Sequence, residues 1–376
     1  MKKIRKSIAF LYGDPVLFAA FAVAMFSALF VHPSKEYLAY LDFRVLSLLF
    51  SMMVVVAGFQ KAGVFGFIVE RLLKFVHNTR MLVFVFVGVC FFGSMLITND
   101  VALITFVPLG IMTLTQTRKG KLLIPVIVLQ TIAANLGSML TPLGNPQNLY
   151  LYSVSNMTMG QFLWTMAMPS GISFLLLVAA IFFIKPERIE PPTEQQGKAV
   201  GRKKALLWCV LFFICLLAVL RILPYGIALA VVLAGAVIFD RKILLWVDYG
   251  LLLTFIFLFV FIGNMENIPV VSDTLSKLVD TREVTVAILL SQVISNVPAS
   301  MLLSKFTANY SALLIGVNLG GLGTLIASMA SVISYKLYAY TRGAKTGRYL
   351  AIFTAMNLLF LGVLWVSVVV LKGVTA

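Results

Sequence analysis

The sequence predicts an all-α membrane protein built from two inverted repeats, with re-entrant hairpins and discontinuous transmembrane helices. Three observations predict this fold. Hydrophobic residues make up 61% of the 376 residues and charged residues only 12%, a composition that a water-soluble fold does not bury. Apolar stretches long enough to span a bilayer recur along the chain. Some of them are interrupted by Asn and Gly in the same order in both halves.

Nine apolar stretches are expected to cross the membrane. Their ranges are 15–31, 44–62, 121–150 with an interruption, 161–184, 204–222, 225–240, 245–265, 309–335 with an interruption, and 348–371. Two further apolar pieces, 81–115 and 283–305, are split by a polar tip. The tips read Thr98-Asn99-Asp100 and Ser295-Asn296-Val297-Pro298. We interpret both pieces as re-entrant hairpins.

The order of these features repeats along the chain. The run from Asn135 to Thr141 (NLGSMLT) aligns with the run from Asn318 to Thr324 (NLGGLGT), and each follows a polar-tipped hairpin. Ordered repetition of this kind predicts two related halves. We expect a first repeat at 1–184 with hairpin 81–115, a cytoplasmic linker at 185–204, and a second repeat at 205–376 with hairpin 283–305.

The relative orientation of the halves depends on the hairpins. If the hairpins do not cross, the counterpart spans that begin at 15 and 225 are odd- and even-numbered crossings, which makes the repeats inverted. If only the first arm of each hairpin crosses, the repeats are parallel, so parity leaves both arrangements open. A cytoplasmic N-terminus places most of the 30 Lys and Arg residues in cytoplasmic segments, as the positive-inside rule requires. We expect a multi-pass protein of the cytoplasmic membrane with its C-terminus outside.

The breaks in the apolar spans carry the chemistry, because an irregular backbone survives at bilayer depth only where protein or water surrounds it. The first break, Asn135 to Asn148, contains Asn145-Pro146, a helix cap followed by a proline at the first helical position. A half-helix is expected to begin there, with its N–H groups favouring an anionic ligand. The second break, Asn318 to Ser334, has no proline, and its small residues can also serve close helix packing.

The expected substrate-binding residues lie in the breaks and at the hairpin tips. They are Asn99, Asn135, Gly137, Ser138, Thr141, Gly144, Asn145, Pro146, Asn148, Asn296, Pro298, Asn318, Gly320, Gly321, Gly323 and Thr324.

A coupling ion is expected at the hairpin tips. Thr98, Asn99, Ser295 and Asn296 offer hydroxyl and amide oxygens, which suit a small cation such as sodium. The simpler interpretation is that these residues only cap the hairpin arms.

Asp100 is the carboxylate placed inside an apolar segment. An ionised Asp at the bilayer centre costs about 2.5 to 3.5 kcal/mol, so it should pair with a cation or take up a proton. We expect a coupling-ion ligand or a proton carrier, and the alternative is an Asp that caps a helix near the cytoplasmic vestibule.

Other classes of function have little support. The sequence contains no HExxH motif, nucleophile elbow or P-loop, so we expect neither an enzyme nor ATP hydrolysis. No cofactor is expected, and sodium is the metal ion considered. The formal charge of +16 comes from short clusters between spans and predicts no nucleic-acid partner, because no soluble domain carries it. The expected partners are the lipid bilayer and a small-molecule or ion substrate.

Four stretches resemble the ion transporter superfamily, which includes arsenite permeases, citrate transporters and divalent anion/sodium symporters. They are ITNDVALITFVPLG, NLGSMLTPLGNPQNLYLY, SNVPAS and NLGGLGTLIAS. The resemblance implies two hairpins that enter from opposite sides, helices broken near the midplane, a homodimer and an elevator-like movement. It places the cation at the hairpin tips, with Gly137 and Gly320 in the facing breaks. The tips differ from the Ser-Asn-Thr signature of the sodium symporters, and TND is closer to the arsenite permeases.

Together, these patterns predict a secondary active transporter for a small anionic solute, an oxyanion or a carboxylate, coupled to a sodium or proton gradient. A cation/proton antiporter and an arsenite efflux permease are the alternatives. An integral membrane enzyme is a more distant one.

Overall fold

The regular structure of the chain is helical. The computed structural model describes residues 15–189, 201–279 and 282–372. In these ranges, extended pairing is limited to an isolated antiparallel bridge between Asn78 and Arg188. The all-α prediction is confirmed, and the inverted relation of the repeats stays a prediction.

Five helices in the described ranges are long and apolar enough to cross a membrane. They are Phe43–Lys61, Gly120–Ser138, Met159–Phe182, Tyr249–Glu266 and Thr346–Leu371. One of them, Gly120–Ser138, is the first part of the first broken span, and the second broken span consists of two shorter helices, as expected from its polar interruption. The number of crossings stays a prediction.

The described helices form two compact units, each made of segments from both halves of the sequence. Unit 1 is built from the described parts of Met1–Ala57, Val210–Asp280 and Met301–Ala308, and unit 2 from those of Gly58–Cys209, Thr281–Ser300 and Asn309–Ala376. The expected domains followed the order of the sequence. Each compact unit instead combines segments from both halves of the chain, because elements distant in sequence pack together.

Unit 1 contains α2 (Pro15–Ser27), most of α3 (Phe43–Lys61), the end of α10 (Arg202–Val219), α11 (Tyr225–Asp240), α12 (Tyr249–Glu266) and α13 (Pro269–Val279). Helix α2 packs along α12, where the rings of Phe21 and Phe257 meet edge to face at 5.2 Å. The buried side chain of Asn264 donates hydrogen bonds to the hydroxyls of Ser27 at 2.9 Å and Tyr37 at 3.0 Å. These hydrogen bonds fix α12 to the end of α2 and to the segment that follows it.

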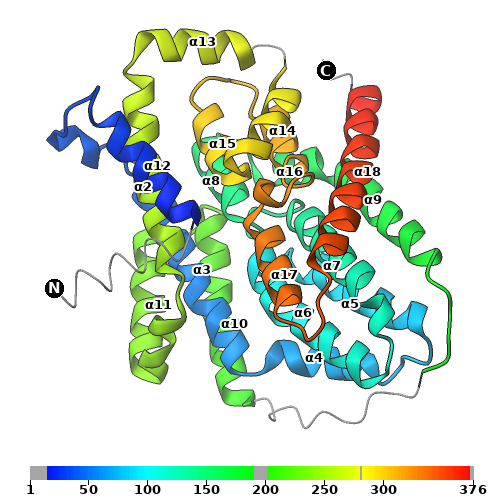
Figure 1. The fold of residues 1–376 in the computed structure, drawn as a ribbon. Helices are drawn as coiled ribbons and strands as arrows, with labels where there is room; N and C mark the ends of the chain where they lie inside the picture. Colours follow the sequence, from blue (N-terminus) through cyan, green and yellow to red (C-terminus); the bar gives the residue numbers. More distant parts are fainter. Residues whose placement is uncertain (1–14, 190–200, 280–281, 373–376) are drawn as a thin grey trace. The chain divides into compact units, whose positions relative to one another are not determined.

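Unit 2 contains both broken spans and most of both hairpins (Figure 1). Its elements are α4 (Val64–Leu73), α5 (Thr79–Gly93), α6 (Asn99–Gln116), α7 (Leu123–Ser138), α8 (Pro146–Val154), α9 (Met159–Phe182), α14 (Glu283–Ile294), the start of α15 (Asn296–Leu303), α16 (Tyr310–Leu319), α17 (Met329–Ala339) and α18 (Thr346–Lys372).

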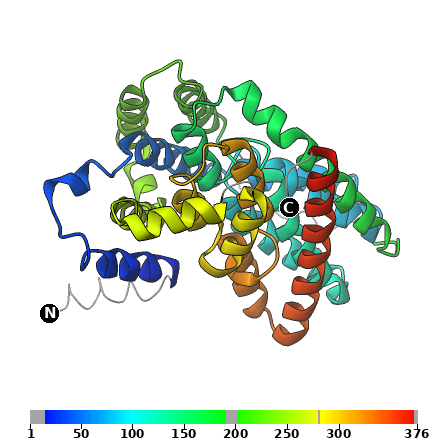
Figure 2. The same ribbon diagram turned by 90° about the horizontal axis from the view of Figure 1, so that it is seen from above.

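Helix α7 lies at the centre of unit 2. Every residue from Val126 to Ser138 is buried, and α7 packs against α5, α6, α9, α17 and α18. Seen from above in Figure 2, α18, drawn in red, runs along the edge of this unit. A helix that is apolar all round but carries Asn135 near its end must place that amide where protein groups satisfy it.

Most helix boundaries lie within three residues of the expected spans. The second parts of the broken spans run four residues further than expected, α8 to Val154 and α17 to Ala339. Two other ends differ by as much. Helix α2 ends at Ser27 instead of reaching 31. Helix α12 begins at Tyr249 instead of 245, because residues 241–246 form a 3-10 helix and Asp248 caps α12. The Asp248 carboxylate accepts the N–H of Leu251 at 3.0 Å, which fixes the start of the helix.

The expected linker at 185–204 falls partly on 190–200, outside the described residues. Its first residues are fixed to the base of the first hairpin. The Thr79 hydroxyl donates to the carbonyl of Lys185 at 2.6 Å, and the Thr79 N–H to that of Glu187 at 2.9 Å. Lys119 pairs with Glu187, and its hydrogen bond and positive charge hold the pKa of that carboxyl below its ordinary range.

Candidate functional site

The first hairpin tip begins α6 beside the first break. Thr98 holds the N-cap position, but its side chain makes no capping hydrogen bond. The N–H of Asn99 donates to the carbonyl of Gly144 at 3.0 Å, and its side-chain Nδ2 donates to Oδ1 of Asn135 at 3.1 Å. Asn99 is the first residue of α6, and it anchors the tip to the break.

The first break separates α7 from α8. Asn145 caps α8 by accepting the N–H of Asn148 at 2.9 Å, and Pro146 is the first helical residue. The predicted restart of the helix is confirmed. A cap followed by proline sets this start locally. Proline suits the first helical position because it has no N–H, and an N–H there would have no partner within the helix.

Two glycines in this break allow backbones to approach closely. A Cβ atom on Gly137 would lie 2.0 Å from the carbonyl oxygen of Phe91, and one on Gly144 would lie 2.0 Å from that of Ser138. Both distances are far inside van der Waals contact. These positions therefore require glycine for packing, whatever else they contact.

Asn148 satisfies carbonyl groups that α7 leaves free where it ends. Its Nδ2 lies 3.3, 3.2 and 3.1 Å from the carbonyl oxygens of Ser138, Met139 and Thr141. The hydroxyl of Thr141 donates to the carbonyl of Met95 at 2.5 Å. The break is thus held by side chains in place of the missing helical hydrogen bonds.

The second break meets the first through Asn318. Its Oδ1 accepts a hydrogen bond from Nδ2 of Asn145 at 3.1 Å, and its Nδ2 donates to Oδ1 of Asn148 at 2.7 Å and to the carbonyl of Leu314 at 2.7 Å. Asn318, Asn145 and Asn148 are all buried. The two breaks are therefore joined by amide pairs deep inside unit 2.

Asn135 makes the reciprocal contact to the second break. The hydroxyl of Ser328, at the N-cap position of α17, donates to Oδ1 of Asn135 at 3.0 Å, and Nδ2 of Asn135 lies 3.4 Å from the carbonyl of Gly321. Ser328 follows Asn318 at the spacing at which Asn145 follows Asn135. Each aligned asparagine thus contacts the helix cap of the other half.

We call the linked residues Asn99, Asn135, Ser138, Asn145, Asn148, Asn318 and Ser328 the asparagine cluster. Ser138 connects its two parts, since its hydroxyl donates to the carbonyl of Asn135 at 2.9 Å and accepts from Nδ2 of Asn145 at 3.1 Å. All seven residues are buried and belong to unit 2. None of them is charged.

The second hairpin tip also reaches the second break. Ser295 has φ +73° and ψ 155°, a conformation that is rare for residues other than glycine and costs about 1 to 3 kcal/mol. Its hydroxyl donates to the carbonyl of Ala327 at 3.3 Å. Asn296 is buried, and its Nδ2 lies 2.9 Å from the place that a Cβ on Gly321 would take. Strain of this kind is typical of binding sites.

Gln292 holds the second break, and the sequence analysis missed it. Its Nε2 donates to the carbonyls of Gly320 at 3.0 Å and Leu322 at 2.9 Å, and its Oε1 accepts the N–H of Thr324 at 2.8 Å. Between them Gly323 has φ +105°, a backbone conformation that favours glycine. No sequence signal marks Gln292, because its hydrogen-bond partners in the break lie 28 to 32 positions further along the chain.

Two further residues were missed. Ser328 could have been found by carrying the spacing between Asn135 and Asn145 into the second half. Gln147 lies inside the first break, in the first turn of α8, where it is buried and its Oε1 has no hydrogen-bond partner within the described residues. A buried amide oxygen of this kind suits a ligand or water.

The other predicted site residues lie at the edge of the cluster. Gly320 packs against Ser291, whose hydroxyl would lie 2.6 Å from a Cβ at that position. Pro298 is buried in the first turn of α15, and Thr324 is exposed. Asp100 is half-buried in the first turn of α6. The residue at the N-cap position is Thr98, and the alternative of an Asp100 that caps the helix stays a prediction.

Four described helices begin at or beside this cluster: α6, α8, α15 and α17. A helix N-terminus presents N–H groups and about half a positive charge. Ser328 makes no side-chain cap for α17, and its hydroxyl donates to Asn135. The described residues contain no group of three or more His, Cys, Asp or Glu side chains that could hold a metal ion. The chemistry of the site is that of amides, hydroxyls and helix N-termini.

Comparisons with known proteins identify relatives among membrane transporters. A family model described as citrate transporter matches residues 14–330. The chain is 32% identical to an uncharacterized transporter of Methanocaldococcus jannaschii, over 83% of this chain and 85% of the relative. It is 31% identical to an inner membrane protein of Escherichia coli, over 81% of this chain and 82% of the relative. It is 23% identical to a 46 kDa membrane protein of Mycobacterium leprae, over 89% and 86%.

Proposed function

Because this chain belongs to the citrate transporter family, we propose that it is a secondary active transporter of a small anionic solute, an oxyanion or a carboxylate. It is a multi-pass membrane transporter, and a sodium or proton gradient supplies the energy. The proposal rests on one observation, the convergence of four helix N-termini on the buried asparagine cluster.

The cluster fits an anion that must be bound and then released. Helix N-termini and amide N–H groups favour negative charge. No Lys or Arg belongs to the cluster, so a bound anion would form no ion pair that holds it tightly. Discontinuous helices whose N-termini point at an anionic group are a recurrent solution in secondary transporters.

The coupling ion is proposed to bind at the hairpin tips. Asp100 follows Asn99 directly, and its N–H donates to Oδ1 of Asn99 at 2.9 Å. The side chain of Asn99 is hydrogen-bonded to both Asp100 and Asn135, so it can couple a change in the charge or ion contacts of Asp100 to Asn135. Ser295 and Asn296 give the second tip hydroxyl and amide oxygens near the other break.

Unit 2 is proposed to carry the site as one body. The hydrogen bonds of the cluster all lie inside unit 2, and they join both breaks to the first hairpin tip. A movement that separated the breaks would leave several buried amides without partners, at a cost of about 1 to 3 kcal/mol each. This supports the elevator-like movement that the resemblance implies.

A cation/proton antiporter is the second candidate, favoured by Asp100 in the first turn of α6. An arsenite efflux permease is the third, because amides and hydroxyls also bind a neutral solute. An antiporter would exchange cations without moving an anion, which separates it from the first proposal.

Transport by the full chain in proteoliposomes tests the proposal. Arsenite, phosphate, sulfate, citrate and succinate are offered under imposed sodium or proton gradients. We expect one anion to accumulate only while a gradient is present. Cation exchange without anion movement would establish the antiporter, and equilibration without accumulation would contradict coupled transport.

A further inference from the structure

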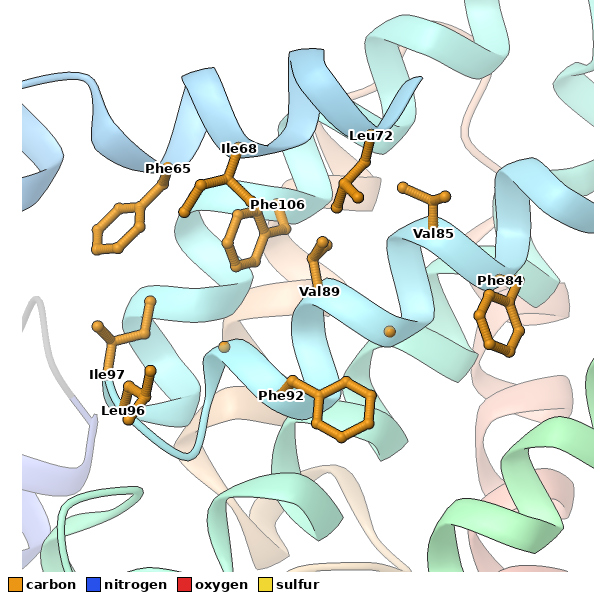
Figure 3. Close-up of a pocket in the computed structure, with 12 residues that line it drawn as sticks. Phe65, Ile68, Leu72, Phe84, Val85, Val89, Phe92, Leu96, Ile97 and Phe106 are labelled. Atoms are coloured by element: carbon orange, nitrogen blue, oxygen red, sulfur yellow. The ribbon is translucent and has the colours of Figure 1, made fainter. Parts of the chain in front are cut away.

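We propose that unit 2 binds the acyl chain of an anionic phospholipid in an apolar pocket between α4 and the first hairpin. The pocket has a volume of about 420 Å³. It is lined by residues of α4, α5, α6 and the segment just before the hairpin tip, including Ile68, Leu72, Val85, Val89 and Phe106 (Figure 3). This site is separate from the asparagine cluster and independent of the transported solute.

The walls of the pocket suit an acyl chain. Figure 3 shows Ile68 and Leu72 of α4 directed toward Val89 and Val85 of α5. Phe106 of α6 contributes to the wall, and its ring meets that of Phe65 with the centroids 6.2 Å apart. An apolar cavity stays dry, and an empty one forfeits the dispersion contacts of its lining. In a membrane protein, the apolar molecule next to such an opening is a lipid tail.

The surface around the pocket is apolar as well. Leu72 is 37% exposed, Phe84 45%, Phe92 52% and Leu96 58%. In a bilayer, side chains with this exposure contact lipid, so the pocket continues the lipid-facing surface inward.

Gly88 keeps the pocket open. It lies in the middle of α5, where a glycine costs about 1 kcal/mol relative to alanine. A Cβ atom added at Gly88 would meet nothing within 4 Å, so no neighbouring backbone requires glycine there. The small residue leaves space that a larger side chain would fill.

Basic residues near one end of the pocket favour an anionic headgroup. Arg71 is adjacent to Leu72, with Glu70 before it. Arg80 lies one helical turn before Phe84, and its guanidinium donates to the carbonyls at the end of α9. Lys74 lies between the two helices. The segment after α9 adds Lys185 and Arg188, and the one acidic residue between them, Glu187, is paired with Lys119. Each Lys or Arg near the membrane surface attracts anionic lipid by about 1 kcal/mol.

Photolabelling tests the proposal. The purified full-length protein, delipidated in detergent, is titrated with phosphatidylglycerol that carries a diazirine on its acyl chain, and the labelled peptides are mapped. We expect labelling of residues 84–97 that saturates and that unlabelled phosphatidylglycerol competes away better than phosphatidylcholine. Labelling that does not saturate, or that is spread evenly over the lipid-facing helices, overturns the pocket. Equal competition by the two lipids overturns the headgroup preference.

A matched pair of variants sharpens the test. Gly88→Leu adds a side chain to the lining of the pocket, and Gly171→Leu adds the same side chain on α9; at both positions a Cβ atom would meet nothing within 4 Å. We expect Gly88→Leu to lose about tenfold in apparent lipid affinity, since excluding about two methylene groups has that effect. Gly171→Leu should bind like the wild type. Unchanged labelling of a folded, monodisperse Gly88→Leu protein would overturn the proposal. If that variant does not fold, the labelling map of the wild-type protein still tests the pocket.

Discussion

Nδ2 of Asn145 lies 3.1 Å from Oδ1 of Asn318, although the two residues are 173 positions apart in the chain. Asn145 caps α8 in the first half, and Asn318 ends the first part of the broken helix in the second half. The contact between Asn135 and Ser328 is its counterpart with the halves exchanged. Two equivalent contacts of this kind support a pseudo-twofold relation between the breaks.

The contact between Asn145 and Asn318 should be measurable as a coupling energy. Asn145→Ala and Asn318→Ala each leave a buried amide without its partner, so each should destabilise unit 2 by about 1 to 3 kcal/mol. The double variant should lose less than the sum, with a coupling of about 0.5 to 3 kcal/mol. Unfolding of the four proteins in one detergent measures this. Asn145→Ala combined with Asn264→Ala, which shares no hydrogen-bond partner with it, should be additive.

Gly137→Ala should destabilise the protein, while Gly171→Ala should not. The added Cβ would lie 2.0 Å from the Phe91 carbonyl in the first case and would meet nothing within 4 Å in the second. We expect a loss of at least about 1 to 3 kcal/mol for Gly137→Ala and a neutral or stabilising effect of up to about 1 kcal/mol for Gly171→Ala. Thermal unfolding compares them. Equal stability of the two variants would show that α7 and α5 can separate at no cost.

Gln292→Met should loosen the second break. The variant keeps the length of the side chain but removes the hydrogen bonds to Gly320, Leu322 and Thr324. We expect faster hydrogen exchange in residues 320–324 and a stability loss of about 1 to 3 kcal/mol. The control is Gln116→Met at the exposed end of α6, which should change neither. Unchanged exchange in 320–324 would mean that the glycine backbone holds this shape by itself.

Asp100→Asn should alter the ion dependence of transport. The amide keeps the shape of the side chain but cannot ionise, so coupling through its charge is lost. We expect uptake to lose its dependence on sodium or on pH, whichever the wild type shows. Uptake rates measured across both gradients check this. A variant that transports at the wild-type rate with the same pH and sodium dependence would remove Asp100 from the coupling mechanism.

The helices and the first break could be predicted from sequence because their causes are local. A bilayer selects apolar stretches by length, and Asn145 with Pro146 fixes the start of α8 within four residues. The same reasoning found the asparagines of the cluster, because each lies at an interruption of an apolar span.

What the sequence did not reveal depends on contacts between distant segments. Gln292 is 32 residues from Thr324, and Ser328 is 193 residues from Asn135. Neither residue has a local signature, since a Gln in a helix or a Ser before one is common. The two compact units arise because helices of the first half pack against helices of the second half. The order of elements along the chain does not determine this packing.

The central claim is that the asparagine cluster binds an anionic solute, and an isosteric charge tests it most directly. Asn318→Asp places a carboxylate in the cluster, and Asn264→Asp makes the same change at a buried asparagine of unit 1 with two side-chain hydrogen bonds. The measurement is the initial rate of gradient-driven anion uptake in proteoliposomes at pH 8. We predict a loss of at least about tenfold for Asn318→Asp, equivalent to about 1.4 kcal/mol, and near wild-type uptake for Asn264→Asp. Equal uptake by the two variants would contradict the account.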